Sequence, residues 1–116
     1  MNDIEKEIFK IFKEHSDNSQ INYVTGDIAS EEFINKNPIC IEENLIQALI
    51  KNGISEENAK RTISFMVEKG LIKYNYVIYN ERPPKPYILY SIKPEDCQET
   101  CCKRILILTE NGKELL

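Results

Sequence analysis

The sequence predicts a single α+β domain, residues 1–116, in which three to four helices precede a β-hairpin, a third strand and a short C-terminal helix. Two observations predict this class. Apolar residues recur at three- and four-residue intervals over most of residues 2–69, as on one face of an α-helix. From residue 71 the pattern changes to runs rich in aromatic and β-branched residues, which favour strands. The length suits one hydrophobic core.

The N-terminal third is predicted to contain two helices and a short strand. Residues 2–15 form an amphipathic helix, because their apolar side chains share one face and their glutamates and lysines the other. Residues 16–19 are typical of a loop, and residues 21–25 of a short strand. A second helix, 27–34, begins at an aspartate suited to an N-cap and ends before Pro38, since the residue before a proline avoids the helical region.

Two further helices are separated by a short turn. The first spans 42–52 and carries leucine and isoleucine at three- and four-residue spacing. Gly53 ends it, because glycine adopts the left-handed conformation common after a helix. The second spans 56–69. It follows the N-cap residue Ser55 and has two glutamates in its first turn, where they suit the helix dipole. Gly70 ends it.

The C-terminal part is predicted to be mainly β-structure. Residues 71–79 and 87–92 form the two strands of a hairpin. Its tip, 80–86, is polar and proline-rich, and it cannot be a central strand because proline donates no ladder hydrogen bond. Residues 104–108 form a short apolar strand, and Thr109 caps a last helical turn or two.

Composition limits the classes of protein that fit. Apolar residues make up 41% and charged residues 29% of the chain, the mix of a soluble globular domain. No stretch approaches the ~20 apolar residues of a membrane helix, and the N-terminus has no signal-peptide pattern, so we expect a cytoplasmic protein without a membrane partner. The single histidine and the lack of phosphate-loop, nucleophile-elbow or zinc-protease motifs argue against an enzyme.

The net charge of −4 hides an uneven distribution. Residues 54–93 carry seven basic and four acidic side chains, a net +3, whereas the rest carries eight basic and fifteen acidic ones, a net −7. A domain that is acidic overall can approach a polyanion by a locally basic face. Charges scattered over solvated faces fit the same composition.

The order of elements from residue 45 onward is the signature of a helix-turn-helix followed by a wing. A turn of a few residues lets the second helix cross the first steeply, so that one face packs on the core and the other projects outward. Ala59, Ile63, Met66 and Val67 form the inward stripe. The residues expected on or beside the outward face are Glu57, Asn58, Lys60, Arg61, Thr62, Ser64, Phe65 and Glu68.

Two segments resemble a known superfamily. Residues 60–72, KRTISFMVEKGLI, look like the recognition helix and first wing strand of winged helix-turn-helix transcriptional regulators. Residues 108–116, LTENGKELL, look like the segment that follows the wing in MarR- and PadR-type members. The resemblance implies a DNA-binding transcriptional regulator.

On this resemblance, helix 56–69 enters the major groove of double-stranded DNA and the tip 80–86 contacts the backbone. A homodimer is also implied, because two helices then meet two half-sites a helical turn apart. Arg61 is the strongest candidate, since its planar donor fork reads guanine or clamps a phosphate. The implied contacts to bases or phosphates are Asn58, Arg61, Thr62 and Ser64, and those that neutralise phosphates are Lys60, Arg82 and Lys85.

Three of the four cysteines, Cys97, Cys101 and Cys102, lie within six residues. They are candidate soft ligands for zinc or copper(I), with Cys40 or His15 as a fourth ligand. Alternatives are an oxidation-sensitive pair, or small buried hydrophobic residues and free surface thiols. The spacing matches none of the strong zinc patterns, so the most economical expectation is a protein without a cofactor.

Other functions fit the same sequence. A winged helix used for protein–protein contacts suits the acidic net charge, the exposed Phe65 and the tyrosine-rich hairpin, since tyrosine is favoured at interfaces. The same tyrosines fit strand packing against the helices. A further alternative is a thiol- or metal-responsive regulator that uses the 97–102 loop.

Overall fold

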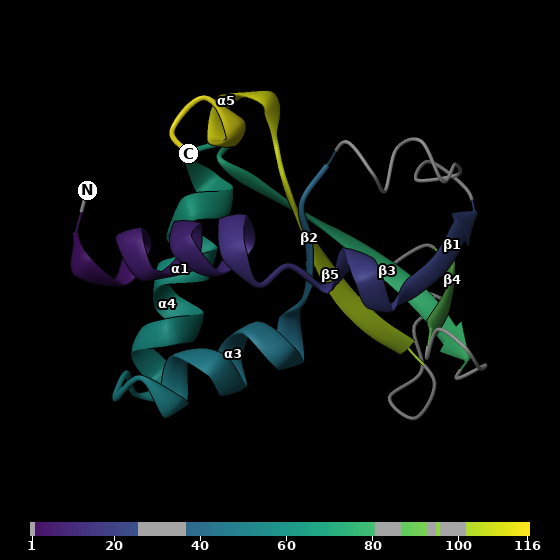
Figure 1. Cartoon of the computed structure of the whole chain (residues 1–116), viewed down its shortest axis with the longest axis horizontal. Coiled ribbons are helices and arrows are strands. Elements are labelled where there is room, and N and C mark those ends of the chain that lie inside the picture. The colour runs from purple at the N-terminus through teal and green to yellow at the C-terminus, as the bar shows by residue number, and fades with distance from the viewer. Residues whose placement is uncertain (1, 26–36, 81–86, 93–94, 96–101) are drawn as a thin grey trace.

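A computed structural model of the chain describes residues 2–25, 37–80, 87–92, 95 and 102–116, and the side chains of residues 2–18, 37–77, 95 and 103–116. The helices gather at one side, and a sheet extends away from them (Figure 1). The described elements are helix α1 (Asp3–Glu14), the 3-10 helix η1 (Asp17–Gln20), strands β1 (Ile21–Thr25) and β2 (Ile39–Ile41), helices α3 (Glu42–Lys51) and α4 (Glu56–Glu68), strands β3 (Ile72–Asn80), β4 (Tyr87–Ile92) and β5 (Cys102–Leu108), and helix α5 (Glu110–Lys113).

The predictions for α1, α3 and α4 are confirmed, with ends within one residue of those expected. α1 follows Asn2, whose side chain accepts a hydrogen bond from the backbone N–H of Glu5 at 2.8 Å. α4 follows Ser55, whose hydroxyl accepts one from the N–H of Asn58 at 3.2 Å. Gly53 and Gly70 both have positive φ, as a helix-ending glycine requires. The helix predicted at 27–34 lies outside the described residues.

The sheet has five strands in the order β1-β4-β3-β5-β2. The predicted hairpin is the antiparallel pair β3 and β4, and its tip 81–86 lies outside the described residues. β5 pairs antiparallel with the other edge of β3, along residues 72–78. The predicted three-stranded antiparallel sheet is therefore present, with β3 at its centre. β1, also predicted as a strand, adds to β4 in parallel.

In the segment between α1 and α3, one strand was not predicted and one predicted loop was wrong. β2 was not predicted, because a strand of only three residues shows no period of its own; it pairs antiparallel with β5, far along the chain. The stretch 16–19 was predicted as a loop, but a 3-10 helix begins at Asp17. Its Asn18 side chain accepts the Ile39 N–H and donates to the Asn37 carbonyl, each at 2.9 Å. The Asn18 side chain thus occupies the outer edge of β2.

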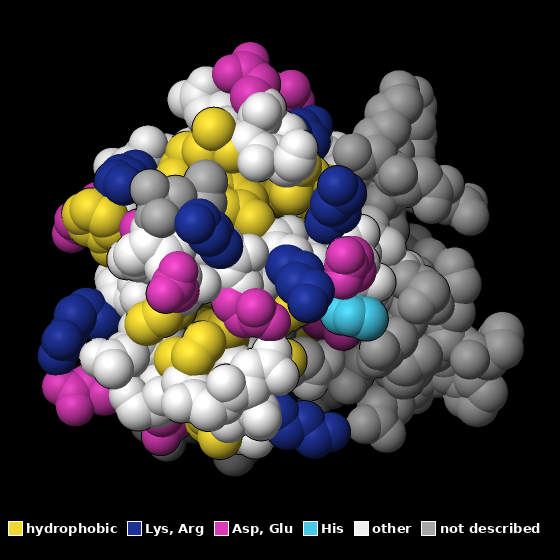
Figure 2. Space-filling model, turned by 60° about the vertical axis from the view of Figure 1, so that its left-hand side comes forward, with side chains coloured by type: hydrophobic (Ala, Val, Ile, Leu, Met, Phe, Trp, Pro, Cys, Tyr) yellow, Lys and Arg dark blue, Asp and Glu magenta, His cyan; other side chains and the backbone are white. Residues whose placement is uncertain are grey.

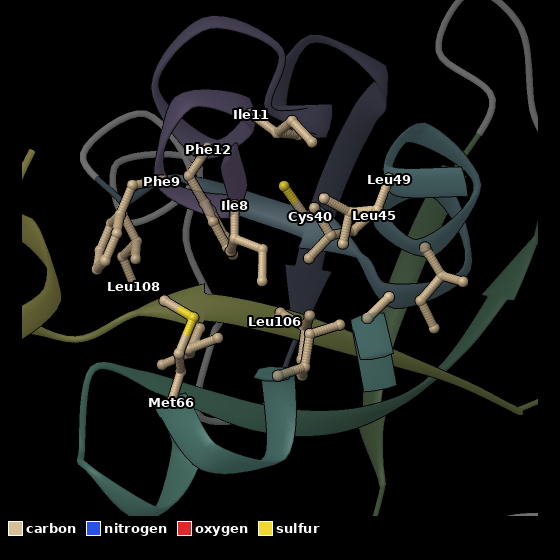
Figure 3. Packing of buried hydrophobic residues seen from close by; sticks show 14 residues of the cluster. Ile8, Phe9, Ile11, Phe12, Cys40, Leu45, Leu49, Met66, Leu106 and Leu108 are labelled. Atoms are coloured by element: carbon tan, nitrogen blue, oxygen red, sulfur yellow. The ribbon is translucent and has the colours of Figure 1, made fainter. Parts of the chain in front are cut away.

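The main core lies between the helices and one face of the sheet (Figure 3). Ile8 and Phe12 from α1 point toward Cys40 from β2 and Leu49 from α3, and all four are no more than 1% exposed. α4 adds Ala59, Ile63 and Met66, and β5 adds Leu106 and Leu108. Because α1, α3 and α4 contact one another and the sheet, this core fixes which side of α4 faces outward.

The opposite face of the sheet carries a second set of buried apolar residues. Successive side chains of a strand point to opposite faces of the sheet. Val77 of β3 and the isoleucines of β2 and β5 therefore lie on the face away from the main core. These residues are Ile39, Ile41, Val77, Ile105 and Ile107, and none is more than 5% exposed. β5 is therefore buried on both faces along residues 105–108.

The last turn, α5, is held against the end of α4. Thr109 caps it as predicted, accepting the Gly112 N–H at 3.1 Å, and also donates its hydroxyl proton to the Gly70 carbonyl. A Cβ at Gly112 would collide with the backbone carbonyl oxygen of Leu71. Glycine is required at this position because the Leu71 carbonyl leaves no space for a side chain. Its conformational freedom is not the reason.

Gly112→Ala is therefore expected to destabilise the protein by about 1–2 kcal/mol, because the steric cost of overpacking outweighs alanine's better helix propensity. Thermal unfolding measures the change. Asn111→Ala, at the exposed neighbouring position, is the control and should leave the midpoint nearly unchanged. An equally stable Gly112→Ala variant would show that α5 moves away from Leu71 without cost.

Candidate nucleic-acid interface

α4 presents one face to solvent because the turn before it and the core beneath it fix its orientation. The backbone N–H groups of Gly53 and Ile54 bond the carbonyls of Ile50 and Leu49, each at 3.0 Å, which closes the end of α3 and redirects the chain. Ala59, Ile63 and Met66 are then buried, as predicted, and Val67 is half-buried. The opposite side of the helix is free to meet another molecule.

The exposed face of α4 carries basic side chains that are already paired with glutamates one turn earlier. The Arg61 guanidinium lies 2.7 Å from the Glu57 carboxylate, and the Lys60 ammonium lies 3.2 Å from that of Glu56. The side chains of both pairs are 60–79% exposed. Such pairs contribute little to stability in water, so their basic members can exchange partners easily. Figure 2 shows one face of the molecule, on which basic and acidic side chains lie side by side.

The other α4 candidates divide between the two sides of the helix. Asn58 and Ser64 are exposed, as predicted. Thr62 is only 8% exposed, and its hydroxyl donates to the Asn58 carbonyl at 2.8 Å. It lies four residues before Met66 and three after Ala59, so it belongs to the inward side, where it is not available to a ligand.

Phe65 and Lys69 are surface features that the spacing argument did not connect. The Phe65 ring is 45% exposed, and the Lys69 ammonium lies 4.4 Å from its centre, in a cation–π contact. The same ammonium is 3.8 Å from the carboxylate of Glu5 in α1, whose side chain is only 5% exposed. Glu5 precedes Ile8, Phe9 and Phe12 at helical spacing, so its position on the apolar stripe was the signal for its burial.

Two of the predicted phosphate contacts, Arg82 and Lys85, lie outside the described residues. The strands that carry this tip are described. β3 runs beyond its pairing with β5 and pairs with β4 through Asn80, and this outer part of the sheet extends beyond the helices (Figure 1). The hairpin and the exposed side of α4 therefore belong to the same packed structure of helices and sheet.

A polar groove of about 330 Å³ lies between the first turns of α3 and α4 and the start of β5. Arg104 donates two hydrogen bonds to the Glu42 carboxylate, at 2.8 and 2.9 Å, and its guanidinium lies 3.9 Å from the Tyr74 ring centre. Lys103 bonds Glu43. The Arg104 and Glu42 side chains are only 34% and 17% exposed, so Arg104 exchanges partners less easily than Lys60, which lines the same groove.

The predicted thiol cluster is only partly described. Cys97 and Cys101 lie outside the described residues, and Cys102 is described only as a backbone position at the start of β5. Cys40 is buried in β2, and burial, with a smaller contribution from the Asp17 charge, raises the pKa of its thiol well above the ordinary range. His15 is exposed at the end of α1. Among the described residues, no three His, Cys, Asp or Glu side chains gather as a metal site would require.

In the part of the chain that the structure describes, no helix has the length and apolar character needed to span a membrane. Comparison of the chain with protein-family models, curated proteins and solved structures returns no match.

Proposed function

We propose that this protein is a winged helix-turn-helix DNA-binding regulator that places α4 in the major groove of duplex DNA. The tip between β3 and β4 would then contact the DNA backbone, with Arg82 and Lys85 on phosphates. A homodimer that meets two half-sites is part of the proposal. The mechanism is binding without chemistry, by a helix held rigidly on a packed core.

The observation that carries the proposal is the outward face of α4. The helix is anchored by buried residues on one side, is preceded by α3 and a tight turn, and is followed by a hairpin that extends past the helical layer. Asn58, Arg61 and Ser64 lie on its exposed side. These residue types are among those that donate hydrogen bonds to phosphates and base edges.

Arg61 is the centre of the proposed contact. In the free protein it is held only by the exposed carboxylate of Glu57, at 2.7 Å. An exposed pair of this kind is worth roughly 0–1 kcal/mol, less than the ~1–3 kcal/mol of discrimination that a good bidentate base contact supplies. DNA would therefore displace Glu57 from Arg61 at small cost, and Glu57 would oppose binding wherever Arg61 has no acceptor.

The test is fluorescence anisotropy of a labelled mixed-sequence duplex, titrated with reduced protein at several salt concentrations. We expect binding that weakens steeply with salt, because displaced counterions drive it. Arg61→Ala should bind more weakly and lower the slope of log affinity against log salt by about one. Glu57→Gln should bind more tightly, since it frees Arg61 and removes a negative charge.

Lys13→Ala is the matched control, because it removes one exposed positive charge from α1, away from α4. It should leave both the affinity and the salt slope nearly unchanged. Flat anisotropy at low salt would contradict the proposal. Equal losses in Lys13→Ala and Arg61→Ala would contradict the placement of α4 at the DNA.

A second candidate function is a winged helix that contacts another protein. The specific observation in its favour is the charge balance at the start of α4, where Lys60 and Arg61 are each matched by a glutamate. Beside them, Phe65 is exposed. An aromatic and an arginine among paired charges suit a protein interface. The thiol- or metal-responsive alternative depends on residues 97–102 and gains no support from the described residues.

A further inference from the structure

We infer that Phe65 is a specificity-determining residue that contacts the C5 methyl group of thymine, and that Lys69 and Glu5 position its ring. This inference rests on the proposed DNA-binding function and extends it to a sequence preference. It follows from the arrangement of three residues along the outer side of α4 and its C-cap, Arg61, Phe65 and Lys69, and one residue of α1, Glu5.

Arg61, Phe65 and Lys69 are spaced four residues apart and therefore lie in one row along the surface of α4 and its C-cap. The aromatic ring stands between two cations. Arg61 is 70% exposed and Lys69 45% exposed at the side chain. Each end of the row is a cation paired with a carboxylate, Arg61 with Glu57 and Lys69 with Glu5. When DNA displaces Glu57, an apolar centre beside an arginine complements the edge of a major groove, where a thymine methyl lies among hydrogen-bond acceptors and phosphates. This charge pattern is the reason for choosing DNA as the occupant.

Lys69, at the C-terminal end of the row, holds the Phe65 ring in place. Lys69 bridges two groups, with its ammonium 4.4 Å from the ring centre and 3.8 Å from the Glu5 carboxylate. Within the described residues, Lys69 is the only basic side chain in ion-pair distance of Glu5. A buried carboxylate is costly unless it is paired, so Glu5 restrains where the Lys69 ammonium can lie. The restraint passes to the ring through the cation–π contact.

Ring position matters for the kind of contact that a methyl group makes. Apolar side chains distinguish thymine from cytosine and the purines by contact with its methyl group in the major groove. The contact is short-ranged, because dispersion attraction falls off within a fraction of an ångström. A Phe65 ring that Lys69 holds in place presents the same edge or face to each DNA site. A freely rotating ring would divide its contact among several positions of the ring.

The experiment selects duplexes from a randomised library with the wild-type protein, then replaces each thymine of the enriched duplex in turn with deoxyuridine. Uracil keeps every hydrogen-bonding group of thymine and lacks only the methyl. At one thymine per half-site we expect about fourfold weaker binding of the uracil duplex by the wild type, the value of one buried methyl group. Phe65→Ala should bind both duplexes equally and more weakly than the wild type binds thymine.

The variants separate positioning from direct contact. Lys69→Arg should keep the thymine preference. Lys69→Gln and Glu5→Gln should both reduce it. In neither should the slope of log affinity against log salt change by more than the loss of the Lys69 charge explains. Lys13→Ala, at an exposed position of α1 outside the proposed interface, should keep the preference in full. Thermal unfolding of each variant identifies any that fail to fold.

The outcomes distinguish this inference from the function on which it rests. Salt-dependent binding and successful enrichment, with equal affinity of the wild type for thymine and uracil at every position, overturn the role of Phe65 and leave DNA binding intact. No salt-dependent binding and no enrichment overturn both, and the row on α4 is then a surface for protein contact. A preference that survives in Phe65→Ala assigns the methyl contact to another residue and also overturns the inference.

Discussion

Replacing Phe12 with alanine is expected to lower the free energy of unfolding by about 3–5 kcal/mol. The Phe12 side chain is 1% exposed and lies in the main core with Ile8 and Leu49 (Figure 3). Its truncation removes a large buried apolar surface and leaves a cavity. Because helices and strands surround the site, they can close the cavity only in part, and the empty volume adds to the lost transfer free energy. Urea unfolding followed by circular dichroism measures the loss.

Phe65→Ala provides a matched control with the same change of side chain. Phe65 is 45% exposed and forms one cation–π contact, so its loss should cost no more than about 1 kcal/mol. Equal destabilisation of the two variants would contradict the placement of Phe12 in the core. An unchanged denaturant slope in both would show that the midpoint shift reflects stability and not a change in the surface exposed on unfolding.

The helices could be predicted from sequence because their signals are local. Ser55 and Thr109 are N-caps in the structure as expected, and the left-handed glycines follow α3 and α4 where the chain changes direction. The aromatic and β-branched residues of 71–79 also predicted β3, which spans Ile72–Asn80. In each case the residues that decide the structure lie within one or two turns of one another.

The strand order could not be predicted, because it depends on pairing between distant segments. β5 lies beside β3 on the edge opposite to β4, although it follows β4 in the sequence. β2 forms because Cys40 and its two neighbours pair with β5. A three-residue strand has too few positions to show alternation, and nothing near Ile39 in the sequence indicates its partner.

The candidate site was predicted in outline and missed in two details. Arg61 and Ser64 lie on the exposed face of α4, as their distance from the buried stripe requires. Thr62 was placed on the wrong side, because a buried stripe is wide enough to include a small residue at its border. The link from Glu5 through Lys69 to Phe65 joins α1 to α4. It could not be predicted, because the periodicity of one helix does not indicate which residues of another helix it will contact.

Asp17 links η1 to the start of α3, and its loss is the second large effect that we expect. One carboxylate oxygen accepts the Ile41 N–H at 2.8 Å, and the other accepts the Asn44 side-chain amide at 3.3 Å. Ile41 is the N-cap residue of α3 and has no capping side chain of its own. Asp17, only 6% exposed, therefore stabilises the outer edge of β2 and the start of α3 together.

Asp17→Ala is expected to destabilise the protein by about 3 kcal/mol at neutral pH, because it leaves the buried Ile41 N–H without an acceptor and removes a hydrogen bond to a charged group. Asp17→Asn keeps an acceptor oxygen and should lose about 1 kcal/mol. Urea unfolding of the three proteins measures both losses. Asp3→Ala, at an exposed aspartate in the first turn of α1, is the control for a change in net charge.

The pH dependence of these variants tests which physical effect dominates at Asp17. Burial raises the pKa of its carboxyl above the ordinary value of 3.8, and the hydrogen bonds from Ile41 and Asn44 lower it by less. A raised pKa in the folded state means that the folded protein holds this proton more tightly than the unfolded chain does. The wild type should therefore gain stability relative to Asp17→Asn as the pH falls from neutral through the folded pKa, with the gain complete below 3.8.

The opposite slope, with the wild type losing stability relative to Asp17→Asn on acidification, would mean that the two hydrogen bonds outweigh desolvation. Asp17 would then be an ordinary capping carboxylate whose charge the fold favours. The expected slope instead means that the protein accepts a charge in an unfavourable place because the Ile41 N–H needs an acceptor there. In that case mild acid, by protonating Asp17, weakens the cap while it relieves the buried charge, and the measured slope is the balance between these two effects.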